Sequence, residues 1–371
     1  MVSQSLQVSQ ILKNYNLCQN CTRRLILKSY QKQYQKSRTF LDRKCYICKD
    51  IFETLDTVLF NIYEKINTFD FKTFNLGLTI KHSYLERDDY LKSKFKIKGI
   101  ENIKSDISNE LAKKITKKTN SQKINENPDI FLQINLKNDS CIIRSKPIFV
   151  YGRYNKKIRN ISQKLRSCKT CNGCGCHNCN FTGLENIESV EGKISDFFKK
   201  KFDAEKVQIN WIGGEDQSSL VLGNGRPFFA KIINPKKRNR LLRKYSNLDA
   251  VYLSELQKLS VQPKGSIPFK SEVSITIDTK KPISLIALKK LDILKNIEIL
   301  NYSKNKKNIP KRIYSVQYKK LGRTSFLLDL FLDGGIPIKL FVQNSDLSPN
   351  VSDLLDNQCL CKKFDFKNII V

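Results

Sequence analysis

The sequence W-I-G-G-E-D-Q-S-S-L-V-L-G-N-G-R-P-F-F-A-K-I-I-N, residues 211–234, joins two glycine-containing turns to strand-like apolar residues on both sides. Asp216 lies between the pair Gly213 and Gly214 and the second turn at 222–227. Because glycine permits tight turns and close approach of the backbone to a ligand, a carboxylate here can face a substrate. Gly-Asp turns are also common at ordinary solvent-exposed positions. The residues alone leave open an active-site acid and a plain surface turn.

Composition favours a particular class of partner. The 371 residues include 67 Lys and Arg against 35 Asp and Glu, so the formal net charge is +32. Such a charge repels itself in a free chain and favours a polyanion, of which a nucleic acid is the simplest. An AT-rich genome could also supply many of the lysines, and both explanations apply. The length predicts two or three domains.

Two features indicate an intracellular environment. Residues 1–10 are polar and lack the apolar core of a signal peptide, and no apolar run approaches the length of a membrane span. These features predict a soluble protein of the cytoplasm or nucleus without a membrane partner. Eight of the 12 cysteines form four C-x-x-C pairs. In a chain without a secretory signal, this spacing favours metal ligands over disulfides.

The first two C-x-x-C pairs predict a structural zinc site in a module at 1–50. They are Cys18 with Cys21 and Cys45 with Cys48. Four thiolates on two tight knuckles suit the tetrahedral geometry of zinc, and a site filled by four protein ligands is closed. Four unligated structural cysteines are the less favoured alternative.

An α/β module is predicted at 51–160. Periodicity indicates a helix, a strand, a second helix and a two-stranded hairpin. Their ranges are 51–67, 74–80, 106–118, 130–136 and 141–150. The sequence Y-G-R-Y-N-K-K-I-R at 151–159 then alternates rings with cations, which suits RNA but also fits a solvated strand end. The predicted RNA contacts in it are Arg153, Tyr154, Lys156, Lys157 and Arg159.

A second cysteine-rich segment at 161–185 predicts a further zinc site. Its paired ligands are Cys168, Cys171, Cys176 and Cys179, with Cys174 and His177 as spare candidates. Two pairs separated by a glycine-containing turn could fold back onto one zinc ion. A flexible linker that picks up adventitious metal is the alternative.

Residues 186–371 are expected to form the catalytic domain. Apolar residues predict a helix near 190–202 and a buried strand at 325–332. Cations cluster at 236–244 and 304–312, where they form either solvated faces or the walls of an RNA cleft. The further predicted RNA contacts are Arg226, Lys236, Lys237 and Arg238.

The central segment also resembles a known family. G-x-E-D, followed by L-G-N-G-R-P-F and then by N-P-K-K-R at 234–238, is similar to the active-site segment of the Pus-ten family of tRNA pseudouridine synthases. The resemblance places the family's catalytic aspartate on Asp216. F-K-T-F-x-x-G at 71–77 and N-P-D-I at 127–130 resemble its THUMP region, an RNA-binding module.

The resemblance extends along nearly the whole chain. G-R-Y-x-K-x-x-R and C-x-x-C-N-F-T-G both have close counterparts in the family. G-G-I-P-I-K-L-F-V at 334–342 resembles the family's late strand G-x-Y-I-K-E, which puts Lys339 at the basic position expected to pair with the catalytic acid. P-N-V-S-D-L-L at 349–355 resembles the family's closing P-S-V-S-E-L-L.

The resemblance implies an α+β fold, in which a zinc-binding and THUMP α/β module precedes a catalytic domain built on a mixed, largely antiparallel sheet flanked by helices. It implies isomerisation of T-loop uridines of tRNA, at positions fifty-four and fifty-five, with Asp216 as nucleophile. We expect a monomer that binds tRNA, acts on no small molecule and contains structural zinc. No organic cofactor is required, because isomerisation adds and removes nothing.

Three positions depart from the family pattern. Gly214 replaces an arginine, Glu272 replaces a tyrosine that packs against the target base, and Pro337 replaces a second tyrosine. These losses leave open a tRNA-binding or tRNA-folding protein of the same ancestry that has lost catalysis. A THUMP methyltransferase or thiolase is disfavoured, because the sequence has no dinucleotide-type glycine turn and no S-G-G-x-D-S loop.

Overall fold

The chain divides into two compact units with separate apolar cores. The computed structural model describes residues 3–25, 43–98, 100–185, 188–301, 310–343 and 347–371. Unit 1 contains Met1–Lys146 and Asn234–Asn239, and unit 2 contains Pro147–Ile233 and Arg240–Val371. Most of the basic run at 304–312 lies outside the described residues. In the part of the chain that is described, no helix has the length and apolar character needed to cross a membrane.

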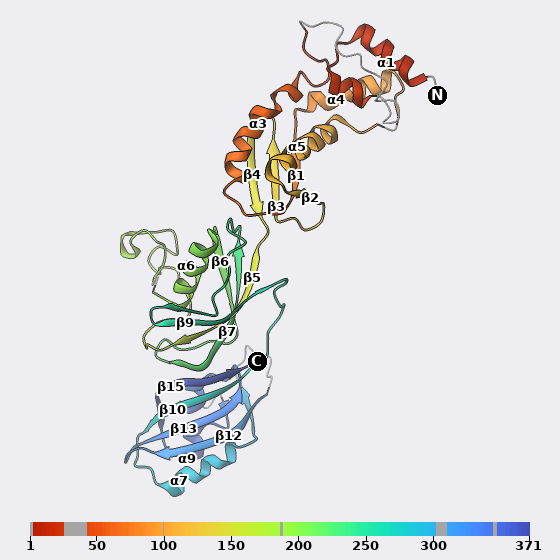
Figure 1. The fold of residues 1–371 in the computed structure, drawn as a ribbon. Helices are drawn as coiled ribbons and strands as arrows, with labels where there is room; N and C mark the ends of the chain where they lie inside the picture. Colours follow the sequence, from red (N-terminus) through yellow and green to blue (C-terminus); the bar gives the residue numbers. More distant parts are fainter. Residues whose placement is uncertain (1–2, 26–42, 99, 186–187, 302–309, 344–346) are drawn as a thin grey trace. The chain divides into compact units, whose positions relative to one another are not determined.

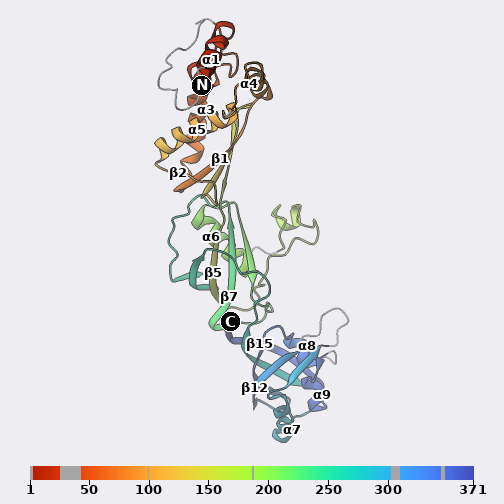
Figure 2. The ribbon, with the colours of Figure 1, turned by 90° about the vertical axis from the view of Figure 1, so that its right-hand side faces the viewer.

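Unit 1 packs helices against a small sheet. Its described helices are α1 (Ser3–Asn14), α2 (Gln19–Arg24), α3 (Ile51–Ile66), α4 (His82–Lys94) and α5 (Ile103–Thr119). Its strands are β1 (Thr73–Thr79), β2 (Gln122–Lys123), β3 (Ile130–Asn135) and β4 (Ser140–Ser145). The sheet has the order β2-β1-β3-β4, in which β1 is parallel to β2 and β3 while β4 is antiparallel to β3. Helix α5 runs alongside β1 (Figures 1 and 2).

The local sequence explains most of these elements. The apolar residues of α3 recur at helical spacing and are buried, and alternate residues of β1 are buried, so the predicted helix and strand are confirmed. Helix α5 is longer than predicted, because Asn102 caps it by accepting a hydrogen bond from the Ser105 amide. Helix α4 was not predicted. It buries only Tyr84, Asp88 and Leu91, which gives too weak an apolar period to recognise.

Unit 2 is built on one large mixed sheet. Its strands are β5 (Ile148–Lys156), β6 (Lys206–Trp211), β7 (Val221–Ile233), β8 (Tyr245–Leu248), β9 (Val251–Leu259), β10 (Lys270–Thr279), β11 (Glu298–Asn301), β12 (Lys311–Lys320), β13 (Ser325–Asp333), β14 (Leu347–Ser348) and β15 (Cys359–Ile370). The described helices are α6 (Val190–Phe202), α7 (Leu285–Lys289), α8 (Ile338–Gln343) and α9 (Val351–Leu355), with 3-10 turns at His177–Cys179 and Lys290–Leu294. The predicted helix near 190–202 and strand near 325–332 are therefore present.

The strand order shows how the sheet is assembled. It runs β14-β11-β12-β13-β10-β15-β7-β5-β9-β8, and β6 pairs with β7. Almost all pairs are antiparallel, and the predicted α+β class is confirmed. Strand β5 pairs with β7 and β9 and so belongs to unit 2, whereas the predicted module at 51–160 includes it.

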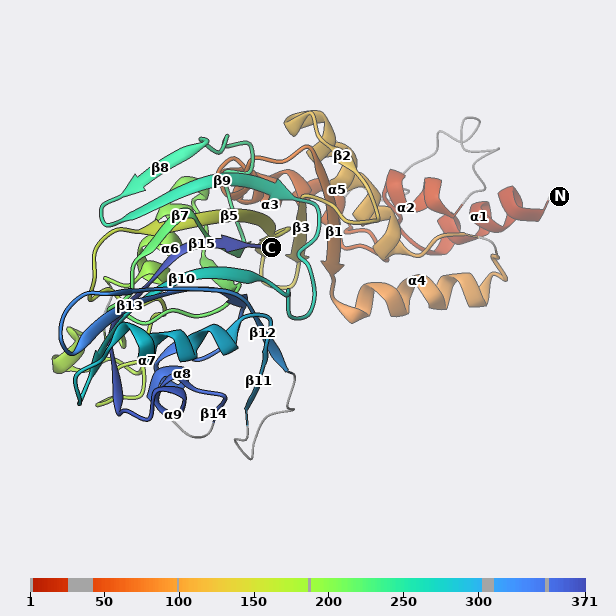
Figure 3. The same cartoon turned by 90° about the horizontal axis from the view of Figure 1, so that it is seen from below.

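The segment that carries Lys339 is not a strand. Gly334 and Gly335 form a turn, and Lys339 lies in the first turn of α8. Figure 3 shows α8 as a helix, and it packs against β15. The expected late strand at 334–342 is therefore wrong. Gly335, with φ of +99°, ends the extended backbone of β13. Pro337 then precedes a helix, where its missing N–H leaves no helical hydrogen bond unmade.

Candidate active site and metal centres

Asp216 lies on the loop that joins β6 to β7, and both of its carboxylate oxygens are engaged. The Nζ of Lys339 lies 2.7 Å from Oδ2. The amide and the hydroxyl of Ser218 donate to Oδ1 at 2.9 and 2.6 Å. The structure thus brings together the two residues expected to form the catalytic pair, which lie 123 positions apart in sequence. Ser218 was not predicted, although an Asp that accepts from the amide two residues on is a common turn pattern.

These contacts favour the ionised acid. Partial burial alone would raise the pKa of Asp216, but hydrogen bonds from Lys339 and Ser218 outweigh it and lower the pKa from 3.8 to about 2. A charged donor stabilises the carboxylate more than it stabilises the neutral acid. Asp216 is therefore an anion at neutral pH and can act as a nucleophile without first losing a proton.

Two cavities adjoin the loop at 212–220 that carries Asp216, here called the acid loop. A cleft of about 600 Å³ is lined by residues 162–166 and 214–217 and by Lys339, so that Asp216 faces open space. A smaller cavity of about 220 Å³ shares Gly214 with it. The walls of the smaller cavity are mostly apolar and include Phe269, Leu332, Ile336, Ile338 and Phe366. A flat, largely uncharged ring could enter such a space beside a charged acid.

Glu215 precedes Asp216 in the acid loop, and its side chain is completely buried between two cations. The Nζ of Lys156 lies 3.1 Å from its Oε1, and the Nε of Arg226 lies 3.5 Å from its Oε2. The hydroxyl of Tyr154 donates to Oε2 at 2.9 Å. Lys156, Arg226 and Tyr154 were predicted to contact RNA, but all three are 0% exposed. That prediction is corrected: these groups act inside the protein, because their polar ends are turned toward Glu215.

The other predicted RNA contacts near β5 differ in exposure. Arg159 forms two hydrogen bonds of 2.7 Å with Asp365 and is partly buried. Arg153 is buried and pairs with Glu255 at 3.1 Å. Only Lys157 of the five is exposed, with its Nζ 4.5 Å from the ring centre of Tyr252. An exposed cation beside an aromatic ring is a combination that suits nucleic-acid binding.

The predicted contacts at 236–238 belong to unit 1. Lys237 pairs with Asp70 at 3.8 Å, and Arg238 pairs with Asp129 at 3.7 Å. The Lys236 carbonyl accepts from the Asp70 amide at 2.7 Å. All three side chains are partly buried. These residues therefore attach the short segment 234–239 to unit 1, and their contacts with its acids compete with any contact to phosphate.

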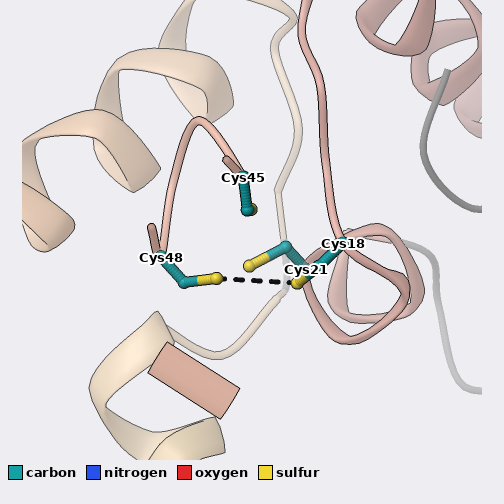
Figure 4. A group of neighbouring side chains, drawn as sticks. All are labelled: Cys18, Cys21, Cys45 and Cys48. Atoms are coloured by element: carbon teal, nitrogen blue, oxygen red, sulfur yellow. Dashed lines mark hydrogen bonds between the residues drawn. The ribbon is translucent and has the colours of Figure 1, made fainter. Parts of the chain in front are cut away.

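The first four-cysteine group has the geometry of a closed metal site. The sulfurs of Cys18, Cys21, Cys45 and Cys48 converge from the start of α2 and from the turn before α3 (Figure 4) and lie within 4.8 Å of one another. Those of Cys18 and Cys48 are 3.5 Å apart. A zinc ion about 2.3 Å from each ligand places tetrahedral sulfurs about 3.8 Å apart, so the cluster fits zinc. All four residues are buried.

The second group is more open. Cys168, Cys171, Cys176 and Cys179 also converge, with Sγ–Sγ distances of 3.7 to 3.8 Å. The amides of Gly175 and Gly183 point to its sulfurs at 3.2 and 3.3 Å. Cys171 and Cys176 are only partly buried. The spare candidates Cys174 and His177 are not part of the group.

An α/β module, two four-cysteine groups and an acid–lysine pair on a large mixed sheet are the features that the resemblance to pseudouridine synthases, a class of RNA-modifying enzymes, leads us to expect. Residues 149–369 match the family model described as Pus10, C-terminal, and residues 60–135 match the model described as Pus10 THUMP domain, archaeal. The chain belongs to the Pus10 family.

Two curated relatives match nearly the full length of this chain, and a third matches about half of it. The tRNA pseudouridine synthase Pus10 of Nitrosopumilus maritimus (strain SCM1) is 41% identical over 98% of this chain and 97% of that protein. The protein of the same name from Cenarchaeum symbiosum (strain A) is 30% identical over 97% of this chain and 91% of its own. That of Archaeoglobus fulgidus is 37% identical over 53% of this chain and 54% of its own.

Proposed function

We propose that the protein isomerises uridine to pseudouridine in the T loop of tRNA, at position fifty-four, position fifty-five or both, with Asp216 as the nucleophile. The observation that carries the proposal is the ionised Asp216 held 2.7 Å from Lys339 at the edge of an open cleft. A uridine within a folded loop must be extruded to reach the acid. The apolar cavity beside Gly214 is the proposed place for the extruded base.

The reaction is an internal exchange of bonds. The N1–C1′ bond breaks, the base rotates in the pocket, and a C5–C1′ bond forms. The proton on C5 is lost and N1 gains one, so the atoms balance and no oxidant or donor is consumed. Asp216 supplies the nucleophilic oxygen, while Lys339 orients it and keeps it charged.

The remaining groups have supporting roles. We propose structural zinc in both four-cysteine groups, a monomeric state and tRNA as the partner. The proposed organisation is a zinc module at 1–50, a THUMP-like domain at 51–160, a second zinc segment at 161–185 and the catalytic domain at 186–371, with the last strand of the second region, β5, contributed to the sheet of unit 2. Lys157 is the most accessible of the proposed RNA contacts near β5.

The departures at Gly214 and Glu272 favour a second candidate, a tRNA-binding protein that no longer catalyses. One experiment separates the two: purified full-length protein is incubated with an unmodified tRNA transcript, and pseudouridine is mapped by a pseudouridine-specific chemical reaction. New T-loop pseudouridine supports the enzyme. Tight tRNA binding without any modification supports the binding protein.

A further inference from the structure

The buried group under the acid loop has a composition that folding alone does not require. Glu215, Lys156 and Arg226 together bury one negative and two positive charges with side chains 0% exposed. Buried ion pairs of this kind are often no more stabilising than apolar residues of similar volume. A role beyond stability is therefore expected for residues that sit immediately beside the reactive acid.

Lys156 connects this group to the main chain of the acid loop. Its ammonium donates to the carbonyl of Asp216 at 3.1 Å and to that of Gln217 at 3.3 Å. A third hydrogen bond, of 2.9 Å, goes to the Ile161 carbonyl. Burial lowers the pKa of Lys156, and the adjacent Glu215 opposes that shift. Glu215 thus helps to keep the lysine charged, and the lysine fixes the loop.

Two further side chains hold the start of the same loop. Arg226 donates to the Ile212 carbonyl at 2.9 Å, and its guanidinium lies 4.4 Å from the ring centre of Phe366. Gln163 donates to the Gly213 carbonyl at 3.3 Å and to the Tyr154 hydroxyl at 3.0 Å. Carbonyls on both sides of Glu215 are thereby tied to one buried network, which leaves the Asp216 side chain free to face Lys339.

We infer that Glu215 and Lys156 form a buried positioning pair that sets the direction of the Asp216 carboxylate. The inference rests on the proposed function of Asp216. Loss of the pair should lower the rate of the chemical step, because small displacements of a reacting group are costly. It should leave tRNA affinity nearly unchanged, since neither side chain reaches the surface.

The test compares Lys156→Met, Glu215→Gln and the double variant with wild-type protein. The buried charge of the three side chains is +1 in wild type, 0 in Lys156→Met, +2 in Glu215→Gln and again +1 in the double variant. We expect kcat on a tRNA transcript to fall roughly 10- to 100-fold in all three variants, with KM within about threefold of wild type. The melting temperature should be lowest in Glu215→Gln and should recover in the double variant.

Recovered stability without recovered kcat separates positioning from a purely structural role. A double variant that regains both stability and kcat, or Lys156→Met with wild-type kcat, would overturn the inference.

A second measurement does not depend on activity, and Lys289→Met, an exposed change on α7, serves as its matched control. The amides of Ser218 and Ser219 donate hydrogen bonds to Asp216, so their hydrogen-exchange rates report how firmly the acid loop is held. Faster exchange in Lys156→Met but not in Lys289→Met supports the inference even if the wild type proves inactive; equal exchange rates contradict it.

Discussion

The two units each contain a carboxylate buried between an arginine and a lysine, and the surroundings of the two differ. In unit 1, Asp88 is 0% exposed, pairs with Arg24, lies 2.9 Å from Lys92 and accepts the amide of Ile103 at 3.1 Å. Its partners belong to α2, α4 and the start of α5. The contacts of Asp88 therefore hold α2, α4 and α5 together.

In unit 2, the partners of Glu215 instead hold the loop that carries the half-buried Asp216, the proposed nucleophile. Lys156 bonds to the backbone on the far side of Glu215, and the next residue, Asp216, faces the cleft. The same arrangement of charges thus serves packing in one unit and orientation in the other. The difference between the two groups is that the hydrogen bonds of one end on regular helices and those of the other end on the loop that carries Asp216.

The largest effect is expected from Asp216→Asn. Because Asp216 is the proposed source of the nucleophilic oxygen and a neutral amide is a poor substitute, pseudouridine formation should fall at least about a thousandfold. Melting temperature and tRNA affinity should change little, whereas Glu215→Gln is expected to lower the melting temperature. Single-turnover assays measure the rate of pseudouridine formation, thermal denaturation measures the melting temperature, and a binding titration measures tRNA affinity. An active Asp216→Asn protein would show that the nucleophile lies elsewhere.

Asp88→Asn should have the opposite profile. Removing one partner of a buried pair leaves uncompensated charge, so unfolding of unit 1 should become easier by about 3–5 kcal/mol. The rate at saturating tRNA should stay near wild type at temperatures where unit 1 is folded. Denaturant titration with parallel kcat measurement tests this. A large loss of kcat in folded protein would remove the contrast between the two carboxylates.

Lys339→Met should lower kcat by roughly 100-fold, because a charged donor to the acid is lost. It should also change the pH profile. The wild-type acid, with a pKa of about 2, stays ionised above pH 4, whereas loss of Lys339 raises the pKa toward its ordinary value near 4. An acidic limb in kcat/KM should then appear below about pH 5 in the variant alone. Since the native pKa is depressed, the related stability is present above the unfolded-state value and is lost as the pH falls toward 2.

The metal groups extend the contrast between closed and open sites. Elemental analysis should find close to two zinc ions per chain. A chelator should remove the ion of the partly exposed group in unit 2 first, and removal from the buried group in unit 1 should unfold that unit. Folded protein without zinc, or the reverse order of loss, would contradict the assignment.

The smallest effect is expected from restoring family residues with Gly214→Arg and Glu272→Tyr. A side chain fits at 214, because the nearest atom to an added Cβ is Oε1 of Gln163 at 3.8 Å. Glu272 is exposed on β10. Activity should rise a few fold if the two losses weaken substrate binding. Unchanged kcat/KM would mean that the two positions do not limit this protein.

Sequence patterns predicted the parts of the structure that depend on local order. The spacing of the cysteines and the apolar periods of α3 and β1 are properties of short segments. The burial of Lys156 could not be read in this way, because its main partner, Glu215, lies 59 positions along the chain. A charged residue in a strand is expected at the surface unless its partner is known. Helix α8 was not expected, because the resemblance indicated a strand at 334–342 although Pro337 disfavours one.

The segment 234–239 has a consequence for synthesis. The chain leaves unit 1 after Lys146, returns to it for six residues and leaves it again after Asn239. The amide of Ser145 is bonded to Oδ1 of Asn234 at 2.8 Å, so part of the N-terminal unit is made from residues translated much later. Domains usually fold one after another as they emerge from the ribosome. Here the first unit cannot be completed until β5, β6 and β7 have all been translated, and a gene fragment that stops at 146 would encode an unfinished fold.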